Sequence, residues 1–349
     1  IMLKKFFQMF SNDIGIDLGT ANTLVYLKGH GIVINEPSVV VVNQKTGQIV
    51  AVGAEAKQML GRTPGHVKAV KPIVDGVISD FEVAEEMITY LINKTERISK
   101  KILRPRVVIG VPTGITNVEI RAVEDAARSA GAREVYIIEE PMSAAIGIHL
   151  PVKEAIGSVI VDVGGGTTDV AVISLSGVVC SKNIKVAGDL LNGDIINYIK
   201  DEFKLLIGER TAENIKIAIA SVSESQALEA EVRGRDLVTG LPRQVIVTDT
   251  DIKEAIMPSI LSLVEGIKEV LETTPPELLS DIIKNGLVLS GGGAMLRGLD
   301  GFLESALKIP VYVAEDSLTA VARGAGVVLD EFETYKEVLL KTDEESISR

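Results

Sequence analysis

A turn suited to phosphate binding occurs twice in the sequence, at residues 14–23 and at residues 161–169. In each copy an apolar run reaches an Asp, a Gly follows two positions later, and small and hydroxyl residues lead into a second apolar run. Glycine turns expose backbone N–H groups that can approach phosphate oxygens, and an Asp beside them can hold Mg²⁺ through water. The repeat therefore predicts two halves that begin with the same element, with a nucleotide's phosphates between them.

Strand-like and helix-like segments alternate along the chain, which predicts an α/β fold with mixed sheets. A hairpin is expected from Leu228 to Thr248, around the turn sequence at residues 239–242. Thr116 and Glu119 have the spacing of a capping box at the start of a helix. The expected strands cover residues 14–18, 23–27, 107–111, 135–138, 159–162, 170–173 and 287–289, and the expected helices cover residues 82–98, 118–130, 190–207 and 251–271.

Composition narrows the possible functions. A formal charge of −12 and the absence of Trp argue against a nucleic-acid groove, since phosphate contacts need clustered Lys and Arg. The single cysteine, Cys180, excludes an intrachain disulfide framework and fits a reducing compartment. With one Cys and 3 His, a transition-metal site is not expected.

The sequence has no apolar run long enough for a membrane-spanning helix. At 349 residues, two domains are expected.

The first eleven residues differ from the acidic remainder of the chain. Four apolar residues have the i, i+3, i+4, i+7 spacing of one helical face, and two Lys and a Gln lie elsewhere on the helix. This pattern predicts an amphipathic segment at residues 1–11 that binds a membrane interface, weakly for one copy and well for many copies on a polymer. A helix docked on its own domain, or a frayed terminus, remains an alternative. The apolar residues are Leu3, Phe6, Phe7 and Phe10.

Three further segments join the two turns. In residues 138–147 two acids and a proline lead into a run of small residues. Residues 286–295 are predicted to form an apolar strand that leads into three glycines. Residues 318–326 are predicted to form a helix of mainly small residues. In this order the five segments resemble the nucleotide-site segments of the actin, hexokinase and heat-shock ATPase superfamily. The sequences at 203–213, 239–243 and 274–278 further resemble the MreB family of bacterial actins, and this likeness extends from about residue 13 to residue 335.

The resemblance implies an actin-like ATPase fold. Such a fold is α/β, with two ribonuclease H-like halves, a nucleotide cleft between them and a smaller subdomain inserted in each half. By this resemblance the first half comprises residues 12–150 and 325–349, with its inserted subdomain at roughly 33–75. The second half comprises residues 151–324, with its inserted subdomain at roughly 188–247.

The family also implies roles for acidic residues and for one threonine. Hydrolysis of a γ-phosphate needs mainly an oriented water, Mg²⁺ and neutralised charge. By resemblance, Glu140 positions the water, whereas the adjacent Glu139 is a solvated or structural partner. Thr167, at the apex of the second turn, would contact the γ-phosphate or hold the attacking water. Asp17 and Asp162 would hold Mg²⁺ through water.

The remaining expected contacts bind the nucleotide. The three glycines at 291–293 approach the adenosine side, where bulky side chains would collide with base and ribose, although alone they could form a bend at a strand end. Glu209 and Arg210 would reach the adenosine, or alternatively form a surface ion pair, and Asp169 could serve only to stabilise its turn. The full predicted set is Thr20, Ala21, Asn22, Gly164, Gly165, Gly166, Thr167, Glu209, Arg210, Thr211, Ala212, Gly291, Gly292, Gly293, Ala294 and Met295.

A second membrane contact is predicted at Ile102 and Leu103, two apolar residues in an otherwise basic loop. Basic residues beside exposed apolar ones suit an anionic lipid surface, and a hydrophobic loop lies in this region in the MreB family. The alternative is that Ile102 packs under the strand that begins at Val107. The neighbouring basic residues are Arg97, Lys100, Lys101, Arg104 and Arg106.

The resemblance implies a cytoskeletal ATPase. Its members bind ATP and Mg²⁺, stack head to tail into filaments, and organise wall synthesis to maintain rod shape. The implied location is cytoplasmic, peripheral on the inner face of the cytoplasmic membrane. The implied partners are further copies of the chain, the anionic membrane surface and membrane proteins of the cell-shape and wall-synthesis machinery.

Two other functions share the superfold. A chaperone of the seventy-kilodalton heat-shock class would continue into a substrate-binding domain, whereas this sequence ends at Arg349. A small-molecule kinase would need an acceptor pocket that the sequence does not reveal. A P-loop enzyme is excluded because no Gly-Lys dipeptide occurs, and a dinucleotide dehydrogenase is disfavoured because neither glycine run matches G-x-G-x-x-G.

Overall fold

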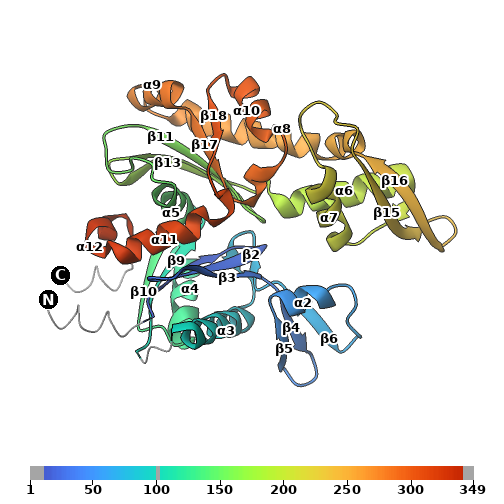
Figure 1. Ribbon diagram of the computed structural model, residues 1–349, viewed down its shortest axis with the longest axis horizontal. Helices are drawn as coiled ribbons and strands as arrows, with labels where there is room; N and C mark the ends of the chain where they lie inside the picture. The colour runs from blue at the N-terminus through green and yellow to red at the C-terminus, as the bar shows by residue number, and fades with distance from the viewer. Residues whose placement is uncertain (1–11, 100–102, 341–349) are drawn as a thin grey trace.

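Two five-stranded sheets of the same topology form the centre of the molecule (Figure 1). The computed structural model describes residues 12–99 and 103–340. In each sheet three consecutive strands are antiparallel and two later strands are added in parallel. The first sheet contains β1 (Ile14–Leu18), β2 (Asn22–Leu27), β3 (Gly31–Pro37), β9 (Arg106–Val111) and β10 (Glu134–Glu139). The second contains β11 (Ser158–Val163), β12 (Thr168–Ser174), β13 (Gly177–Ile184), β17 (Leu287–Ser290) and β18 (Val311–Val313).

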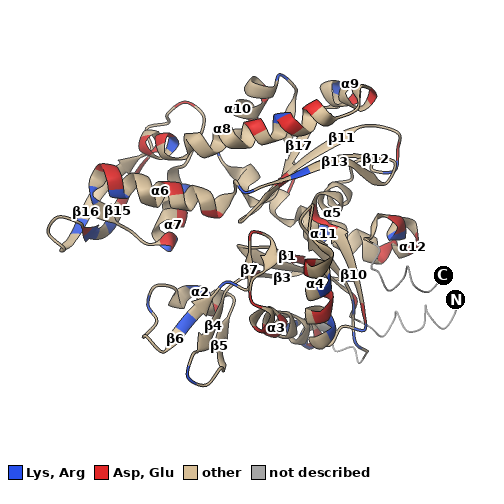
Figure 2. Ribbon diagram, turned by 180° about the vertical axis from the view of Figure 1, so that it is seen from behind, with Lys and Arg blue, Asp and Glu red and all other residues tan. Residues whose placement is uncertain are grey.

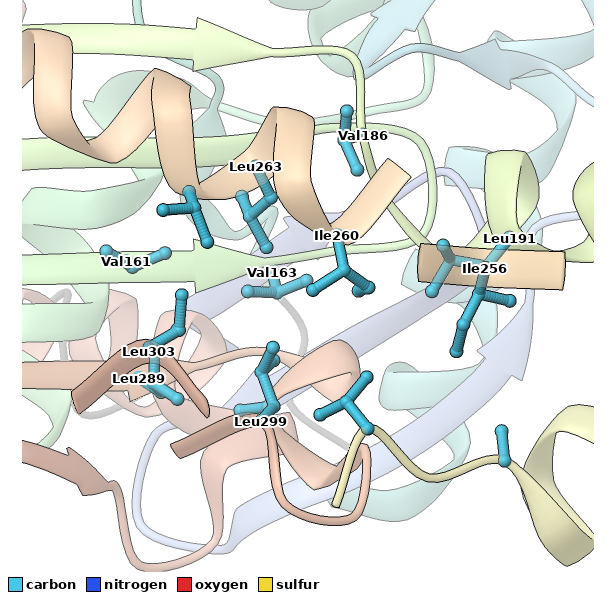
Figure 3. Packing of buried hydrophobic residues seen from close by; sticks show 14 of the residues in the cluster. Val161, Val163, Val186, Leu191, Ile256, Ile260, Leu263, Leu289, Leu299 and Leu303 are labelled. Carbon is cyan, nitrogen blue, oxygen red and sulfur yellow. The ribbon is translucent and has the colours of Figure 1, made fainter. Parts of the chain in front are cut away.

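Helices cover both faces of each sheet. On their outer faces, α3 (Phe81–Ser99) and α4 (Asn117–Ser129) pack on the first sheet, and α8 (Asp249–Thr273), α9 (Pro276–Asn285) and α10 (Leu299–Leu307) on the second. Between the sheets lie α5 (Glu140–Gly147) and α11 (Ala320–Asp330), which share a third core with both. Figure 3 shows the outer core of the second sheet, where Val161 and Leu289 face Leu263 of α8 and Leu303 of α10. Buried aliphatic side chains therefore hold every layer together.

Two smaller sheets extend from the large ones. One contains β4 (Val40–Asn43), β5 (Ile49–Val52) and β6 (Val67–Val70), beside α2 (Ala54–Met59). The other contains β14 (Leu205–Leu206), β15 (Glu229–Asp236) and β16 (Pro242–Thr248), beside α6 (Gly188–Phe203) and α7 (Glu209–Ile219). Figure 1 shows both at the same side of the molecule, away from the termini. The described part of the chain also contains short elements: β7 (Ile73–Val74), β8 (Val77–Ile78), α12 (Phe332–Tyr335), and 3₁₀ turns η1 (Gly292–Met295), η2 (Ser317–Thr319) and η3 (Lys336–Val338).

Several local predictions can be compared with these elements. The hairpin is confirmed, since β15 and β16 are antiparallel with Glu229 opposite Thr248. The capping box at Thr116 is also confirmed. The predicted end of the helix at residue 207 is wrong, because α6 ends at Phe203. Lys204 takes a left-handed conformation with φ 52°, and the next two residues pair with β15 as strand β14. Within the described residues, no helix is long and apolar enough to cross a membrane.

Close packing of α5 against α11 depends on two glycines. A methyl group added to Gly324 would lie 1.7 Å from the carbonyl oxygen of Ser143, and one added to Gly147 would lie 2.1 Å from that of Ala320. The hydroxyl of Ser143 also donates a hydrogen bond to the carbonyl of Val321 at 2.8 Å. Small residues in these two segments therefore allow the helices to approach backbone to backbone between the sheets.

The substitution Gly324→Ala should lower the free energy of unfolding by about 1–3 kcal/mol, because the added methyl group forces α5 and α11 apart. Gly193→Ala in α6 is the matched control, since nothing lies within 4 Å of its added methyl group. Its higher helix propensity should stabilise the protein by up to about 1 kcal/mol. Urea unfolding of both variants measures the difference, and equal stabilities would contradict the prediction.

Candidate functional site

A cavity of about 520 Å³ lies between the two halves, at the ends of β1 and β11. This volume is typical of a small-molecule site. Both predicted phosphate turns, the acid that begins α5 and the glycines after β17 line it, although they are far apart in the sequence. The predicted site residues that line this cavity are Asp17, Thr20, Ala21, Asn22, Glu140, Asp162, Gly164, Gly165, Gly166, Thr167, Gly291, Gly292, Gly293 and Met295.

The two phosphate turns touch each other. A methyl group added to Gly165 would lie 2.5 Å from the Cβ of Ala21, and one added to Gly166 would lie 2.6 Å from Oγ1 of Thr20. That Oγ1 accepts a hydrogen bond from the N–H of Gly76 at 3.0 Å. Glycine is required at these two positions because any side chain there would collide with the opposing turn.

The glycines after β17 pack against the end of β11. Gly291 has φ +80°, and a methyl group there would lie 2.4 Å from the carbonyl oxygen of Val163. A methyl group on Gly293 would lie 2.2 Å from a methyl carbon of the same valine. The three glycines therefore form a bend at the end of β17 and also line one wall of the cavity.

Three carboxyl groups, of Asp17, Asp162 and Glu140, meet at this cavity. Burial, followed by the charge of Asp162, raises the pKa of Asp17 from 3.8 to about 8. Burial raises the pKa of Asp162 to about 6, even though the hydroxyl of Ser290 donates to it at 2.7 Å. The pKa of Glu140 is raised by burial and by the charges of Asp169, Asp17 and Asp162. Like charges held together in this way favour a bound cation.

These carboxylates fit a Mg²⁺ ion held partly by other ligands. No group of three or more His, Cys, Asp or Glu side chains in residues 12–99 and 103–340 is arranged to hold an ion directly. Mg²⁺ usually keeps several waters and uses one or two carboxylates together with substrate phosphates. Asp17 and Asp162, at the ends of the two equivalent strands β1 and β11, are placed for that kind of binding.

The structure separates the two adjacent acids. Glu140 is the first residue of α5, only 8% exposed, and it lines the cavity. Glu139, the last residue of β10, precedes the helix without a capping hydrogen bond from its side chain, is half-buried and does not line the cavity. Of the two, only Glu140 can face a bound ligand.

Five predicted contacts lie outside the cavity lining. Arg210 lines a separate cavity of about 250 Å³, Glu209 forms an ion pair with Lys71, and Ala212 is fully buried. Thr211 and Ala294 also do not line the large cavity.

The next turn of α7 lines the cavity instead, through Glu213 and Lys216. The Nζ of Lys216 donates to the carbonyl of Gly188 at 2.6 Å, and burial lowers its pKa. Spacing along the helix places positions 213, 216, 217 and 220 on one face, and all four line the cavity. The sequence thus offers this group of residues, but the packing of α7 decides that this face meets the cavity.

Lysine–carboxylate pairs cross between the halves, and two of the carboxylates, those of Asp189 and Glu213, also line the cavity. In Figure 2 an acidic position of α7 lies at the end of that helix nearest to α2. All of these side chains are partly exposed, so each pair contributes at most about 1 kcal/mol. Such weak contacts can hold the halves together and still be broken. They join Lys57 to Glu213 at 2.9 Å, Lys71 to Asp189 at 3.0 Å and Lys185 to Asp75 at 3.2 Å.

Comparison with known proteins identifies the family to which this chain belongs. The family model for MreB/Mbl protein matches residues 11–337. The chain belongs to the MreB/Mbl family. It is 51% identical over 323 residues to the cell shape-determining protein Mbl of Bacillus subtilis, covering 92% of this chain and 97% of Mbl. It is 53% identical over 334 residues to the cell shape-determining protein MreB of Escherichia coli, covering 94% and 96%.

Solved structures agree with this MreB/Mbl assignment. The crystal structure of MreB5 of Spiroplasma citri bound to ADP has a TM-score of 0.89 and 36% identity, over 94% of this chain and 98% of that one. A MamK double helical filament has a TM-score of 0.78 over 91% and 99%, and its 24% identity supports the fold alone. The predicted family is therefore confirmed, and so is the predicted actin-like α/β fold.

Most of the residues predicted to contact a membrane lie outside the part of this MreB/Mbl chain that the structure describes. Leu3, Phe6, Phe7, Phe10 and Ile102 lie outside the described residues. Leu103 is described and is half-buried. Membrane contact at both segments stays a prediction from the sequence.

The pKa of Asp17 predicts how stability without ligands depends on pH. Because its pKa is higher in the folded protein, folding takes up a proton, and the stabilisation present below about pH 4 is lost as pH rises to about 8. Asn cannot ionise, so Asp17→Asn should remove this loss and become more stable relative to wild type as pH increases. Urea unfolding between pH 4 and pH 8 without Mg²⁺ measures this. A stability difference that does not change with pH would contradict the assignment.

Proposed function

We propose that this chain binds ATP and Mg²⁺ in the cavity between its halves, hydrolyses the ATP, and polymerises head to tail into filaments on the inner face of the cytoplasmic membrane. There it would organise cell-wall synthesis and maintain rod shape. The observation that carries the proposal is the meeting of both glycine turns and three carboxyl groups at one cavity. The structures of MreB5 bound to ADP and to AMPPNP support the choice of nucleotide.

The two turns are suited to the phosphates, and α7 and η1 to the adenosine. Backbone N–H groups of Gly164, Gly165 and Gly166 would bind phosphate oxygens from one half, and Thr20 would face them from the other. Glu213 and Lys216 of α7 offer polar groups, and Met295 of η1 lines the same cavity. Bound Mg²⁺, near Asp17 and Asp162, would neutralise phosphate charge.

Glu140 is suited to orient the attacking water. It lies at the cavity wall beside the two aspartates, and its raised pKa reflects a buried carboxyl group among like charges. Thr167 is only 6% exposed and lines the same cavity, so its hydroxyl is available to the phosphate or the water. Hydrolysis needs little more from the protein than this orientation and the neutralised charge.

Assembly and location rest on the family. Head-to-tail contacts are heterologous and need not close, so they extend into filaments. The amphipathic pattern of residues 2–10 would attach each subunit weakly, and a filament would present many such segments to an anionic membrane. Membrane proteins of the wall-synthesis machinery would then meet the filament at that surface.

Glu140→Ala should slow phosphate release by about 100-fold or more, because the water loses its positioning group. Nucleotide affinity should persist, since the variant removes a like charge from the cavity. Glu139→Ala is the matched control, an adjacent acid that does not line the cavity, and it should hydrolyse ATP nearly as wild type does. Phosphate release and fluorescent-nucleotide binding measure both effects. Equal rates in the two variants would reject Glu140 as the positioning group.

Electron microscopy with ATP and Mg²⁺, with and without anionic liposomes, tests the filament itself. Wild-type protein should form filaments and coat the liposomes. Monomers under every condition, with phosphate transferred only when a small-molecule acceptor is added, would overturn the proposal in favour of a kinase.

Deleting residues 2–10 should weaken cosedimentation with anionic liposomes, because the apolar face of the segment is lost. Binding of nucleotide should remain intact, which serves as the control for folding. Neutral liposomes should bind less wild-type protein than anionic ones. Unchanged binding after the deletion would move the membrane contact to Ile102 and Leu103, or argue against membrane binding.

A further inference from the structure

A buried carboxylate links the two halves behind the cavity. Asp169, on β12 of the second sheet, is 1% exposed. Its Oδ1 accepts two hydrogen bonds from Thr113, one from the backbone N–H at 2.7 Å and one from the hydroxyl at 2.6 Å. Thr113 follows β9 of the first sheet, at the end of that strand. These bonds therefore join the ends of strands that belong to different halves.

The same carboxylate reaches Thr167. Asn183 of the neighbouring strand β13 donates to both carboxylate oxygens at 3.1 Å. The hydroxyl of Thr167 is 3.5 Å from Oδ2, a long hydrogen bond that a small rotation of the carboxylate would strengthen or break. Four shorter hydrogen bonds thus set the plane of the Asp169 carboxylate, and Thr113 provides two of them on one oxygen.

The segment that carries Thr113 also packs near Gly76, which lies close to the Thr167 hydroxyl. A methyl group added to Gly76 would lie 2.9 Å from the ring of Pro112 and 3.4 Å from Oγ1 of Thr167. Pro112 and Thr113 are adjacent, so their segment packs near Gly76 and hydrogen-bonds to Asp169. The first half therefore reaches the surroundings of the Thr167 hydroxyl through this segment, by its bonds to Asp169 and its position beside Gly76.

We propose that Thr113 is a positioning residue for hydrolysis, which acts from the first half through Asp169 to hold the Thr167 hydroxyl toward the phosphates. The inference rests on the proposed ATPase function. Thr113 does not line the cavity, so it would not touch the nucleotide. A change in the relative placement of the halves would move Thr113, turn the Asp169 carboxylate and shift the Thr167 hydroxyl. Hydrolysis would in this way be coupled to the placement of the halves.

Thr113→Val and Thr113→Ser test this inference. Valine keeps the shape and the backbone N–H bond but loses the hydroxyl donor, whereas serine keeps that donor. We expect Thr113→Val to lower kcat by about tenfold with little change in KM, the pattern of an interaction that matters mainly in the transition state. Thr113→Ser should restore kcat to within about twofold of wild type.

A double-mutant cycle with Thr167→Val identifies the route. If Thr113 acts through the Thr167 hydroxyl, adding Thr113→Val to Thr167→Val should cause no further loss of kcat. Additive losses would show that Thr113 acts elsewhere and would overturn the inference.

Two more outcomes separate this inference from the proposed function. Wild-type kcat in Thr113→Val, even with a lower melting temperature, would mean a structural link only and would overturn the inference. The ATPase proposal would then stand on the hydrolysis by wild type and its loss in Glu140→Ala. Absence of hydrolysis by wild type under all conditions would overturn both.

Discussion

The close approach of α5 and α11 is the contact on which the rest of the structure depends. Gly147 and Gly324 let the two backbones meet where any side chain would collide, and both helices share a core with the inner faces of the two sheets. The distance between the sheets is thereby set by helix backbones. That distance places β1 and β11 so that their phosphate turns touch, and so that α5 begins with Glu140 at the cavity.

The site shaped by this contact is electrostatically unfavourable without ligands. Three carboxyl groups approach one another with raised pKa values, while weak lysine–carboxylate pairs join the halves. A cation bound together with a polyphosphate would replace the repulsion between these carboxyl groups with attraction across the cavity. The chemistry of the site and the placement of the halves are therefore coupled, and the buried bonds between Thr113 and Asp169 carry part of that coupling.

Much of the fold and site could be predicted locally. The antiparallel hairpin at 229–248 and the capping box at Thr116 follow from short-range turn and capping rules. The end of α6 could not be predicted, because Lys204 adopts a left-handed conformation only as the following residues pair with β15. Glu213 and Lys216 were missed because the choice among faces of α7 depends on what that helix packs against.

The sequence by itself determined the family, the repeat of the phosphate turn and the residue types that a nucleotide site needs. These depend on adjacent residues, whose geometry is limited by backbone conformation and side-chain size. Tertiary structure decided which face of α7 meets the cavity, which lysine and carboxylate pair between the halves, and that Thr113 bonds to Asp169. Such contacts join residues far apart in the chain, and only the packing of helices between the sheets brings them within hydrogen-bonding distance.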